Sequence, residues 1–518
     1  MKVDTRALQQ VYAQFPSLKV NTDKGALEAA ATKVLGASGA RELMASLQQN
    51  DVYLAARSEA ISQSPDVQQQ QPKRAVVSGL SAGGMLAAAV LAKAGYQVDA
   101  VELRDGYTRN IQFSTRQAMI DELASIEPAL AEKFLDVAAH IVRGSHSTLN
   151  GEKKFTERAA PKAGDPMGVP QSGEEMLNEA PITLVECKMF ERVVFDWLKQ
   201  QPNVTLHTNH QIVMSQPDEL GRYSVSMTPR KGGTSVSLGT PDLVVVAEGG
   251  GSAATRKSLG IESMATSPAS RMVAGTIERP SGGRVASHYV DQKKADGGTE
   301  RILAMALGSA KADKTWAIVE VPTDELFDPG PNLDPTSKEY RDAQQSLIEK
   351  HFRSEAALVI EGDISEAKLE GPFEGSRPTL FTLQQKMSNK ATAGANVLTL
   401  GDFVGTGHFI VGGGVATATV SHIERLKDLV FDLELGLDKA ASLAKYGQGA
   451  IADTLAWGRR GVYEFYPEVK DRNVVSEAYV KAVTEWVSGK NKDPLAALEK
   501  LLVPHGLSLP PIGTPKAA

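Results

Sequence analysis

The spacing of hydrophobic and polar positions changes along the chain and divides it into regions. Residues 1–65 carry apolar side chains at helical spacing and predict a helical extension. This spacing begins with Leu8, Val11, Tyr12 and Phe15. Residues 62–73 are Gln-rich and contain two prolines, which is typical of a linker. We expect the extension to be a packed cap on the rest of the protein, with a partner-binding module as the alternative.

After the linker, the pattern is that of strands alternating with helices. The apolar run 75–78 predicts a strand, the Ala-rich run 83–95 a helix, and residues 98–103 a second strand. A strand, a Gly-rich turn, a helix and a strand form the beginning of a parallel βαβ unit. Helical material is expected to follow to about residue 142. The polar stretch 152–175, with Gly and Pro, predicts a loop.

The second half of the chain begins with strands and ends with helices. A helix is expected over 187–200. Strands are expected at 204–209, 223–227, 243–247, 271–278, 285–290, 301–308 and 315–321. The last four are expected to form a separate antiparallel meander. Further elements are expected as a helix over 335–355, strands at 379–386 and 397–400, a long helix over 414–431 and helices to about residue 502.

Composition and charge limit the functional classes. The chain has 518 residues, enough for two or three joined domains, with 42% apolar and 23% charged residues. A net charge of −6 gives no electrostatic reason to bind nucleic acid or an anionic membrane. The single cysteine, Cys187, excludes an internal disulfide and a Cys-x-x-Cys redox pair.

The apolar segments of the sequence match neither a signal peptide nor a membrane span. The N-terminal residues are polar and have no apolar signal-peptide core. The longest apolar stretch, residues 85–92, is far shorter than the ~20 residues that a membrane span needs. We therefore expect a cytoplasmic protein, and no metal site is predicted.

The turn after the first strand carries the clearest candidate chemistry. It reads Gly79-Leu80-Ser81-Ala82-Gly83-Gly84, one residue away from G-x-G-x-x-G. Gly79 permits a tight turn, Ser81 is small enough for a pyrophosphate to approach if its φ is negative, and Gly84 lets the helix pack on the strand. The helix N-terminus offers free amide groups to phosphates. Glu102, 23 residues after Gly79, ends the second strand, where an acid can accept hydrogen bonds from ribose hydroxyls.

Two further segments complete a family pattern. Residues 242–247 form a strand followed by Glu248 and Gly249, with Ser252 and Arg256 beyond. Residues 397–400 form another strand, which ends in Gly401-Asp402. With the first turn, these segments make residues 74–430 resemble the single-component (group A) flavoprotein aromatic hydroxylases of the para-hydroxybenzoate hydroxylase type.

The resemblance implies roles for these segments. In the family, the second segment ends in Asp-Gly and contacts FAD and NAD(P)H; here Glu248 replaces the aspartate. Asp402 corresponds to an aspartate that binds the ribityl chain of FAD. A glycine-rich segment and a helix follow, as the family requires, with Gly412, Gly413, Gly414 and Val415. The N-terminus of that helix is expected to face the flavin pyrimidine carbonyls and to stabilise the anionic reduced flavin.

The resemblance also implies a fold and its domains. We expect an α/β fold in which a Rossmann-like FAD-binding domain, residues 73–270 with 389–431, is interleaved with an antiparallel-sheet substrate domain, residues 271–388. Residues 1–72 are then a helical N-terminal extension and linker. Residues 432–518 are a helical C-terminal region with a disordered tail.

The implied activity is that of an FAD-dependent monooxygenase. NAD(P)H reduces the flavin without a domain of its own. A flavin hydroperoxide then hydroxylates or epoxidises a small aromatic or indolic substrate. By position, further cofactor contacts are expected from Leu103, Arg104, Arg109 and Gln112. His408 and Arg116 are the catalytic candidates, and Trp316 is expected to pack within the sheet.

Other interpretations stay open. Weaker similarities lead to the kynurenine 3-monooxygenases, through residues 200–206, and to MICAL monooxygenases, through residues 102–110. A flavin-dependent reductase or desaturase, and a halogenase, are alternative enzymes. The halogenase is disfavoured because Trp316 and Pro322 match its Trp-x-Trp-x-x-Pro segment poorly. A non-catalytic dinucleotide-binding interaction module is the alternative outside enzymes.

Overall fold

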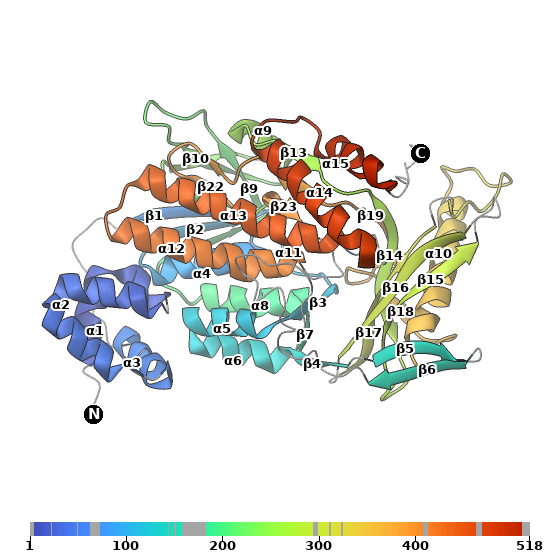
Figure 1. Cartoon of the computed structure of the whole chain (residues 1–518), viewed down its shortest axis with the longest axis horizontal. Coiled ribbons are helices and arrows are strands. Elements are labelled where there is room, and N and C mark those ends of the chain that lie inside the picture. Colours follow the sequence, from blue (N-terminus) through green and yellow to red (C-terminus); the bar gives the residue numbers. More distant parts are fainter. Residues whose placement is uncertain are drawn as a thin grey trace.

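The structure is a computed structural model with an α/β architecture and a helical N-terminal extension (Figure 1). It describes residues 5–21, 23–48, 50–62, 73–142, 144–149, 152–157, 183–293, 299–309, 312–322, 325–407, 413–462 and 469–509. A mainly parallel sheet with helices on one side lies beside a long antiparallel sheet, and a cavity lies where the two meet.

The parallel sheet follows the predicted strand–turn–helix–strand pattern. Its strand order is β21 (Thr392–Ala393), β22 (Val397–Thr399), β12 (Leu243–Val246), β1 (Arg74–Ser78), β2 (Gln97–Glu102) and β8 (Val204–Thr208). β1 pairs in parallel with both β2 and β12, so the ends of the predicted motifs meet at one sheet edge. Only β21 runs antiparallel to its neighbour. The near-continuous apolar runs in β1 and β12 are explained by burial on both faces.

Alternate residues of these strands face different layers. Val77 and Val245 pack against helices, whereas Val76 and Val244 pack against a small antiparallel sheet. The helical layer contains α4 (Ala82–Lys93), α5 (Gln117–Ile126), α6 (Pro128–Val137), α8 (Cys187–Leu198), α12 (His422–Glu434) and α13 (Lys439–Val462). The opposite layer contains β9 (His210–Met214), β10 (Val225–Pro229), β11 (Val236–Gly239) and α9 (Ala253–Leu259).

The long antiparallel sheet has one face on a helix and the other toward the parallel sheet. Its order is β18 (Leu369–Glu370), β14 (Ser270–Glu278), β17 (Ala312–Glu320), β16 (Thr299–Ser309), β4 (Ala139–Val142), β7 (Thr183–Glu186) and β3 (Gln112–Thr115), with β15 (Ser287–Lys293) on β16 and β19 (Thr379–Leu383) on β14. Val273, Ala317 and Val319 pack on α10 (Lys338–Val359). Ala274 and Trp316 belong to a cluster on the other face.

Several sequence expectations for this sheet were wrong. β14 pairs with β17 and not with β15, so the predicted meander is incorrect in its strand order. β3 and β4 interrupt the region expected to be helical, because their pairing with β7 outweighs the local pattern. β6 (Glu152–Glu157) pairs with β5 (Gly144–Leu149) where a loop was expected. The rest of that expected loop lies outside the described residues.

The N-terminal extension is helical, as predicted, and packs on the rest of the protein. It consists of α1 (Thr5–Gln14), η1 (Pro16–Lys19), α2 (Lys24–Ser46) and α3 (Asn50–Ser62), with a kink in α2 at Gly36 (φ 74°). Its apolar core is closed by Phe431 of α12. Arg57 donates hydrogen bonds to the backbone carbonyls of Lys19 and Ser125, which joins the extension to α5.

The remaining elements complete the C-terminal side. They are β13 (Ser263–Ala265), β20 (Lys386–Ser388), η2 (Gly401–Phe403), β23 (Gly405–Thr406), α11 (Gly413–Ala416), a π-helical turn (Thr417–Ser421), α14 (Val469–Val487), α15 (Pro494–Leu502) and η6 (Val503–His505). The predicted helices in this region are confirmed, and the tail from residue 510 lies outside the described residues. Among the described helices, none combines the length and apolar character that crossing a bilayer requires.

Candidate functional site

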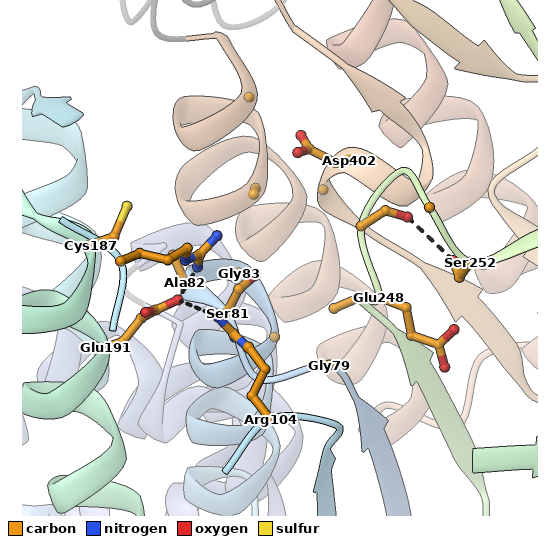
Figure 2. A pocket seen from close by; sticks show the side chains of 18 of the residues that line it. Gly79, Ser81, Ala82, Gly83, Arg104, Cys187, Glu191, Glu248, Ser252 and Asp402 are labelled. Carbon is orange, nitrogen blue, oxygen red and sulfur yellow. Dashed lines mark hydrogen bonds and ion pairs between the residues drawn. The ribbon is translucent and has the colours of Figure 1, made fainter. Parts of the chain in front are cut away.

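A cavity of about 1170 Å³ lies at the junction of the two sheets. The end of β1, the start of α4, the end of β2, the β12–α9 loop and the Gly401–Asp402 turn line one part of it. β3 and the antiparallel strands β14, β16, β17 and β19 line the other. Figure 2 shows the Gly79–Gly83 turn, Glu248 and Asp402 around the first part. Ligands of open α/β sheets bind in this position, beyond the carboxyl ends of the strands.

The glycine-rich turn is set by close backbone packing. Gly79 has a φ of 88°, and a Cβ there would lie 2.5 Å from the carbonyl oxygen of Ala247. A Cβ on Gly84 would lie 1.8 Å from the carbonyl oxygen of Gly79. Ser81 has a φ of −87°, as its place in the motif required, and its side chain makes no capping hydrogen bond. The first-turn amides of α4, which have no partner within the helix, are therefore left for a ligand.

Glu102 and Arg104 form a second fixed group at the cavity wall. One Glu102 oxygen accepts the Leu80 amide at 2.6 Å, and the other accepts the Arg104 amide at 2.9 Å and Nε at 2.8 Å. Burial alone would raise the pKa of Glu102, but the hydrogen bonds and charge of Arg104 hold that pKa below its usual value. Glu102 is thus an ionised acceptor placed directly behind the turn.

A buried carboxylate that sequence reasoning missed joins two arginines here. Glu191 of α8 is 1% exposed, pairs with Arg109, and lies 3.6 Å from Arg104 Nη1. Burial raises the pKa of Glu191, and the two arginines oppose that shift. Arg109 Nε and Glu191 Oε2 are both buried without a hydrogen-bond partner in the described structure. A cluster of one carboxylate and two arginines thus lies on the cavity wall (Figure 2).

Cys187 lies beside this cluster, at the start of α8 (Figure 2). It lines the cavity, and burial raises the pKa of its thiol to about 12. The thiol is therefore protonated near neutral pH and is a weak nucleophile there.

The second predicted segment is held by hydrogen bonds from neighbouring elements. Glu248 accepts the Ser78 and Thr255 hydroxyls, each at 2.6 Å, so it ties the end of β1 to α9. Arg256 is buried and stacks 4.1 Å from the Phe403 ring centroid. It donates to the Phe403 carbonyl at 2.6 Å and to Ser388 Oγ at 2.7 Å. Arg256 thus binds this segment to the Gly401–Phe403 turn, and it is not part of the described cavity lining.

Asp402 faces the same cavity from the third predicted segment. Its side chain is exposed to the cavity. The surrounding protein desolvates the carboxyl and raises its pKa, and the charge of Arg109 opposes this shift. A Cβ on Gly414 would lie 3.1 Å from Asp402 Oδ1. The Gly401 amide donates to His422 Nδ1 at 2.9 Å, and burial lowers the pKa of His422 to about 4. A neutral imidazole thus holds this turn in place.

Most of the candidate residues named from the sequence meet in this cavity. Those that line it are Gly79, Ser81, Ala82, Gly83, Gly84, Glu102, Leu103, Arg104, Arg109, Gln112, Glu248, Gly249, Asp402, Gly414 and Val415. Gly413 begins α11 next to the lining. Gly412 and the catalytic candidate His408 lie outside the described residues. Arg116 does not belong to the described lining; it is buried and stacks 5.0 Å from the centroid of a Trp457 ring.

Comparisons with known proteins identify the fold. Neither a scan of protein-family models nor a search of curated proteins gave a match. Similar solved structures include CmlS, a flavin-dependent halogenase, with a TM-score of 0.52 and 14% identity over 84% of this chain and 78% of CmlS. They also include PqsL from Pseudomonas aeruginosa, described as a probable FAD-dependent monooxygenase, with a TM-score of 0.50 and 17% identity over 83% of this chain and 99% of PqsL.

A third similar structure is a flavoprotein/dehydrogenase from Cytophaga hutchinsonii, with a TM-score of 0.50 and 14% identity over 84% of this chain and 92% of that one. The chain has the fold of FAD-dependent monooxygenases. At these identities the likeness establishes the fold alone. The FAD-monooxygenase fold predicted from the three segments is thereby confirmed.

Two site features were missed in the sequence, and only the first had a signal there. Glu191 lies on the apolar stripe of α8, between Phe190 and Val194, where a charged residue is out of place. Trp316 was expected to pack within the sheet; it does so and also lines the cavity. Only the pairing of β17 with β14 and β16 reveals which face Trp316 occupies.

Proposed function

We propose that this protein is an FAD-dependent monooxygenase that uses NAD(P)H and dioxygen to hydroxylate or epoxidise a small, largely apolar molecule. One observation carries the proposal. The Gly79–Gly84 turn with Glu102, and the Gly401–Asp402 turn with Gly414, open into the same cavity although more than 300 residues separate them. Separate cavities would have contradicted a shared dinucleotide.

The residues present fit FAD. The cavity exceeds the roughly 300–1,000 Å³ of pockets for drug-sized ligands, as an elongated dinucleotide requires. A Cβ on Gly83 would meet the Ala418 carbonyl oxygen at 2.9 Å, so glycine is needed there for α4 to pack closely on the Thr417–Ser421 turn, and both Gly83 and Ala418 line the cavity. Arg109 also lines the cavity and adds a cationic guanidinium to its wall. Bare amides and a guanidinium are the groups that bind a diphosphate.

The nucleotide part of the cavity supplies binding. The first-turn amides of Ala82 and Gly83 would donate to the diphosphate, where the partial positive charge of the α4 N-terminus stabilises anions. Glu102 is kept ionised by Arg104, and its remaining lone pairs would accept ribose hydroxyls. Leu103 and Val213 line the cavity with exposed apolar side chains that suit the adenine ring.

The other half of the cofactor would lie between Asp402 and the antiparallel sheet. When bound, FAD supplies hydride acceptance from NAD(P)H and activation of dioxygen. The role of the chain is to orient and to keep water out. Asp402 would accept a ribityl hydroxyl, the start of α11 near Gly414 and Val415 would face the pyrimidine edge, and the apolar sheet face would keep the reacting centre dry.

The first experiment is to purify the protein and measure its flavin content, NAD(P)H oxidation and product oxygen from labelled dioxygen. Bound FAD that NAD(P)H reduces, with dioxygen-derived oxygen in a product, supports the proposal. Transfer of hydride to an alkene would identify a reductase, and halide-dependent products a halogenase. A protein that binds no FAD contradicts the proposal outright.

A matched pair of variants tests the cofactor site without relying on activity. Glu102→Gln removes the charge behind the turn and is expected to weaken FAD binding about ten-fold, the effect of one charge-assisted hydrogen bond. Glu262→Gln changes an exposed carboxylate away from the cavity and should bind FAD normally. Calorimetric titration of the apoprotein with FAD measures both. Equal affinities would remove Glu102 from the site.

A further inference from the structure

The N-terminal extension is joined to two helices that lead toward the cavity. Phe431 of α12 belongs to the apolar core of the extension. Val20, which follows η1, belongs to the main core that also contains residues of α4 and α12. Arg57 of α3 donates a hydrogen bond to the backbone carbonyl of Ser125, near the end of α5. The extension therefore contacts both α12 and α5, through the part of α12 that lies away from α11 (Figure 1).

A buried network of three charges joins these elements. Glu122 of α5 and Lys427 of α12 are both buried and form an ion pair, with Oε2 and Nζ 3.0 Å apart. Lys427 Nζ also donates to Ser125 Oγ at 3.3 Å, while Arg57 holds the carbonyl of the same residue. Burial raises the pKa of Glu122, and the charges of Lys427 and then of Arg57 oppose this shift. Arg57, which is 2% exposed, thus brings a second cation to a buried carboxylate.

The two helices that this network joins continue into different walls of the cavity. α5 follows β3 directly, and Phe113 and Ser114 of β3 line the cavity. α12 continues the helical stretch of α11 and the π-helical turn, where Val415 and Ala418 line the cavity. α5 also packs against that π-helical turn. The separation of these two walls therefore depends on how α5 packs against α12.

We propose that Arg57 is a positioning residue for the cavity: by tying α5 to α12, it fixes the separation of two cavity walls and so raises the affinity for FAD. The ligand in this inference rests on the proposed function, whereas the clamp itself belongs to the apoprotein. Arg57 is not part of the described lining, so it acts only through the helices that it joins. Walls already held in the binding arrangement lose less conformational freedom when a ligand binds. If only a fraction of the molecules has that arrangement, the apparent affinity falls in proportion to this fraction.

The test compares full-length variants of two arginines in the extension. Arg57→Met keeps an unbranched side chain but removes the charge and the donors, and Arg57→Lys keeps the charge. The control is Arg41→Met, since Arg41 is exposed on α2 and its Nε donates to the Ala37 carbonyl of its own helix. Calorimetric titration of each apoprotein with FAD gives the dissociation constant. We expect Arg57→Met to bind FAD about five- to ten-fold more weakly, at the lower end of typical coupling between sites. Arg57→Lys should lie between Arg57→Met and the parent, and Arg41→Met should equal the parent.

Melting temperatures distinguish positioning from a purely structural role. A residue that only stabilises the fold would lower the melting temperatures of the apoprotein and the FAD-bound protein alike and leave the dissociation constant unchanged. In Arg57→Met, the rise in melting temperature on addition of FAD should instead be smaller than in Arg41→Met, because the weaker complex stabilises the folded state less.

Cys187 reports on the cavity wall without any cofactor. It is the single cysteine of the sequence, it lines the cavity, and burial raises the pKa of its thiol to about 12. Loosened walls would let water reach the thiol and lower this pKa. Alkylation of Cys187 in the Arg57→Met apoprotein at pH 8 should therefore be at least about five-fold faster than in the Arg41→Met apoprotein.

Either of two results would overturn the inference: equal FAD affinities of Arg57→Met and Arg41→Met, or equal rates of Cys187 alkylation in the two apoproteins. If Arg57→Met does not fold, Phe431→Leu, a milder change at the contact between α12 and the extension, is judged by the same two measurements. Failure of the proposed function has a different signature, a parent protein that binds no FAD. The alkylation rates then decide alone whether the extension clamps the cavity.

Discussion

Gly79→Ala should damage the turn on which the whole site depends. The residue has a φ of 88°, and a side chain in that left-handed region costs roughly 1–2 kcal/mol. In addition, the new Cβ would lie 2.5 Å from the Ala247 carbonyl oxygen and 3.0 Å from the Glu248 Cα, both backbone atoms that cannot rotate away. Forced overpacking of this kind costs about 1–3 kcal/mol. Together, these effects should lower the free energy of unfolding by about 2–5 kcal/mol.

The matched control is Gly282→Ala. Gly282 has a φ of 74°, close to that of Gly79, but a Cβ there would have no atom within 4 Å. It should therefore show only the conformational cost of about 1–2 kcal/mol. Chemical denaturation of both variants and the parent gives the difference, which isolates the contact between β1 and β12. If Gly79→Ala is no less stable than Gly282→Ala, the close packing of this turn has been misread.

Two other predictions concern buried titratable groups. Burial lowers the pKa of His422 to about 4, whereas a histidine of the unfolded chain has a pKa of ~6.5. The unfolded chain therefore binds the proton more strongly. The neutral imidazole contributes fully to the stability of the folded state above pH ~6.5, and this contribution falls by roughly 3 kcal/mol as the pH drops toward 4. His422→Gln should flatten this part of the stability–pH profile, and an unchanged slope would refute the assignment. Cys187, with its pKa raised to about 12, should be alkylated at pH 8 at least ~100-fold more slowly than a free thiol; a comparable rate would contradict the raised pKa.

The parts of the fold that were predictable from the sequence are those fixed by short-range patterns. The β1–α4–β2 unit was visible because apolar runs, a glycine turn and helical spacing all lie within about thirty residues. The third segment, β22 with Gly401-Asp402, was found in the same way. Even the condition on Ser81, a negative φ, followed from the geometry that the turn must have.

The features that were missed depend on contacts between distant segments. β3 is only four residues long, and its strand character comes from pairing with β7, some seventy residues later. Glu191 gains its meaning from Arg104 and Arg109, which belong to a different part of the chain. The isolation of Gln112 Oε1 exists only once the antiparallel sheet is assembled around it. No local window of sequence contains this information.

The same distinction explains how the fold can persist at 14–17% identity to solved structures of the same fold. The end of the cavity at the parallel sheet is built largely from backbone, so it constrains few side chains beyond glycines where a Cβ would clash and an acid such as Glu102. The end at the antiparallel sheet is lined by side chains carried on regular strands. Side chains such as Trp316 can therefore differ between proteins of this fold while the backbone of the two turns stays the same. It follows that likeness in fold says little about what this cavity binds, and that its ligand must be argued from the side chains that line it in this chain.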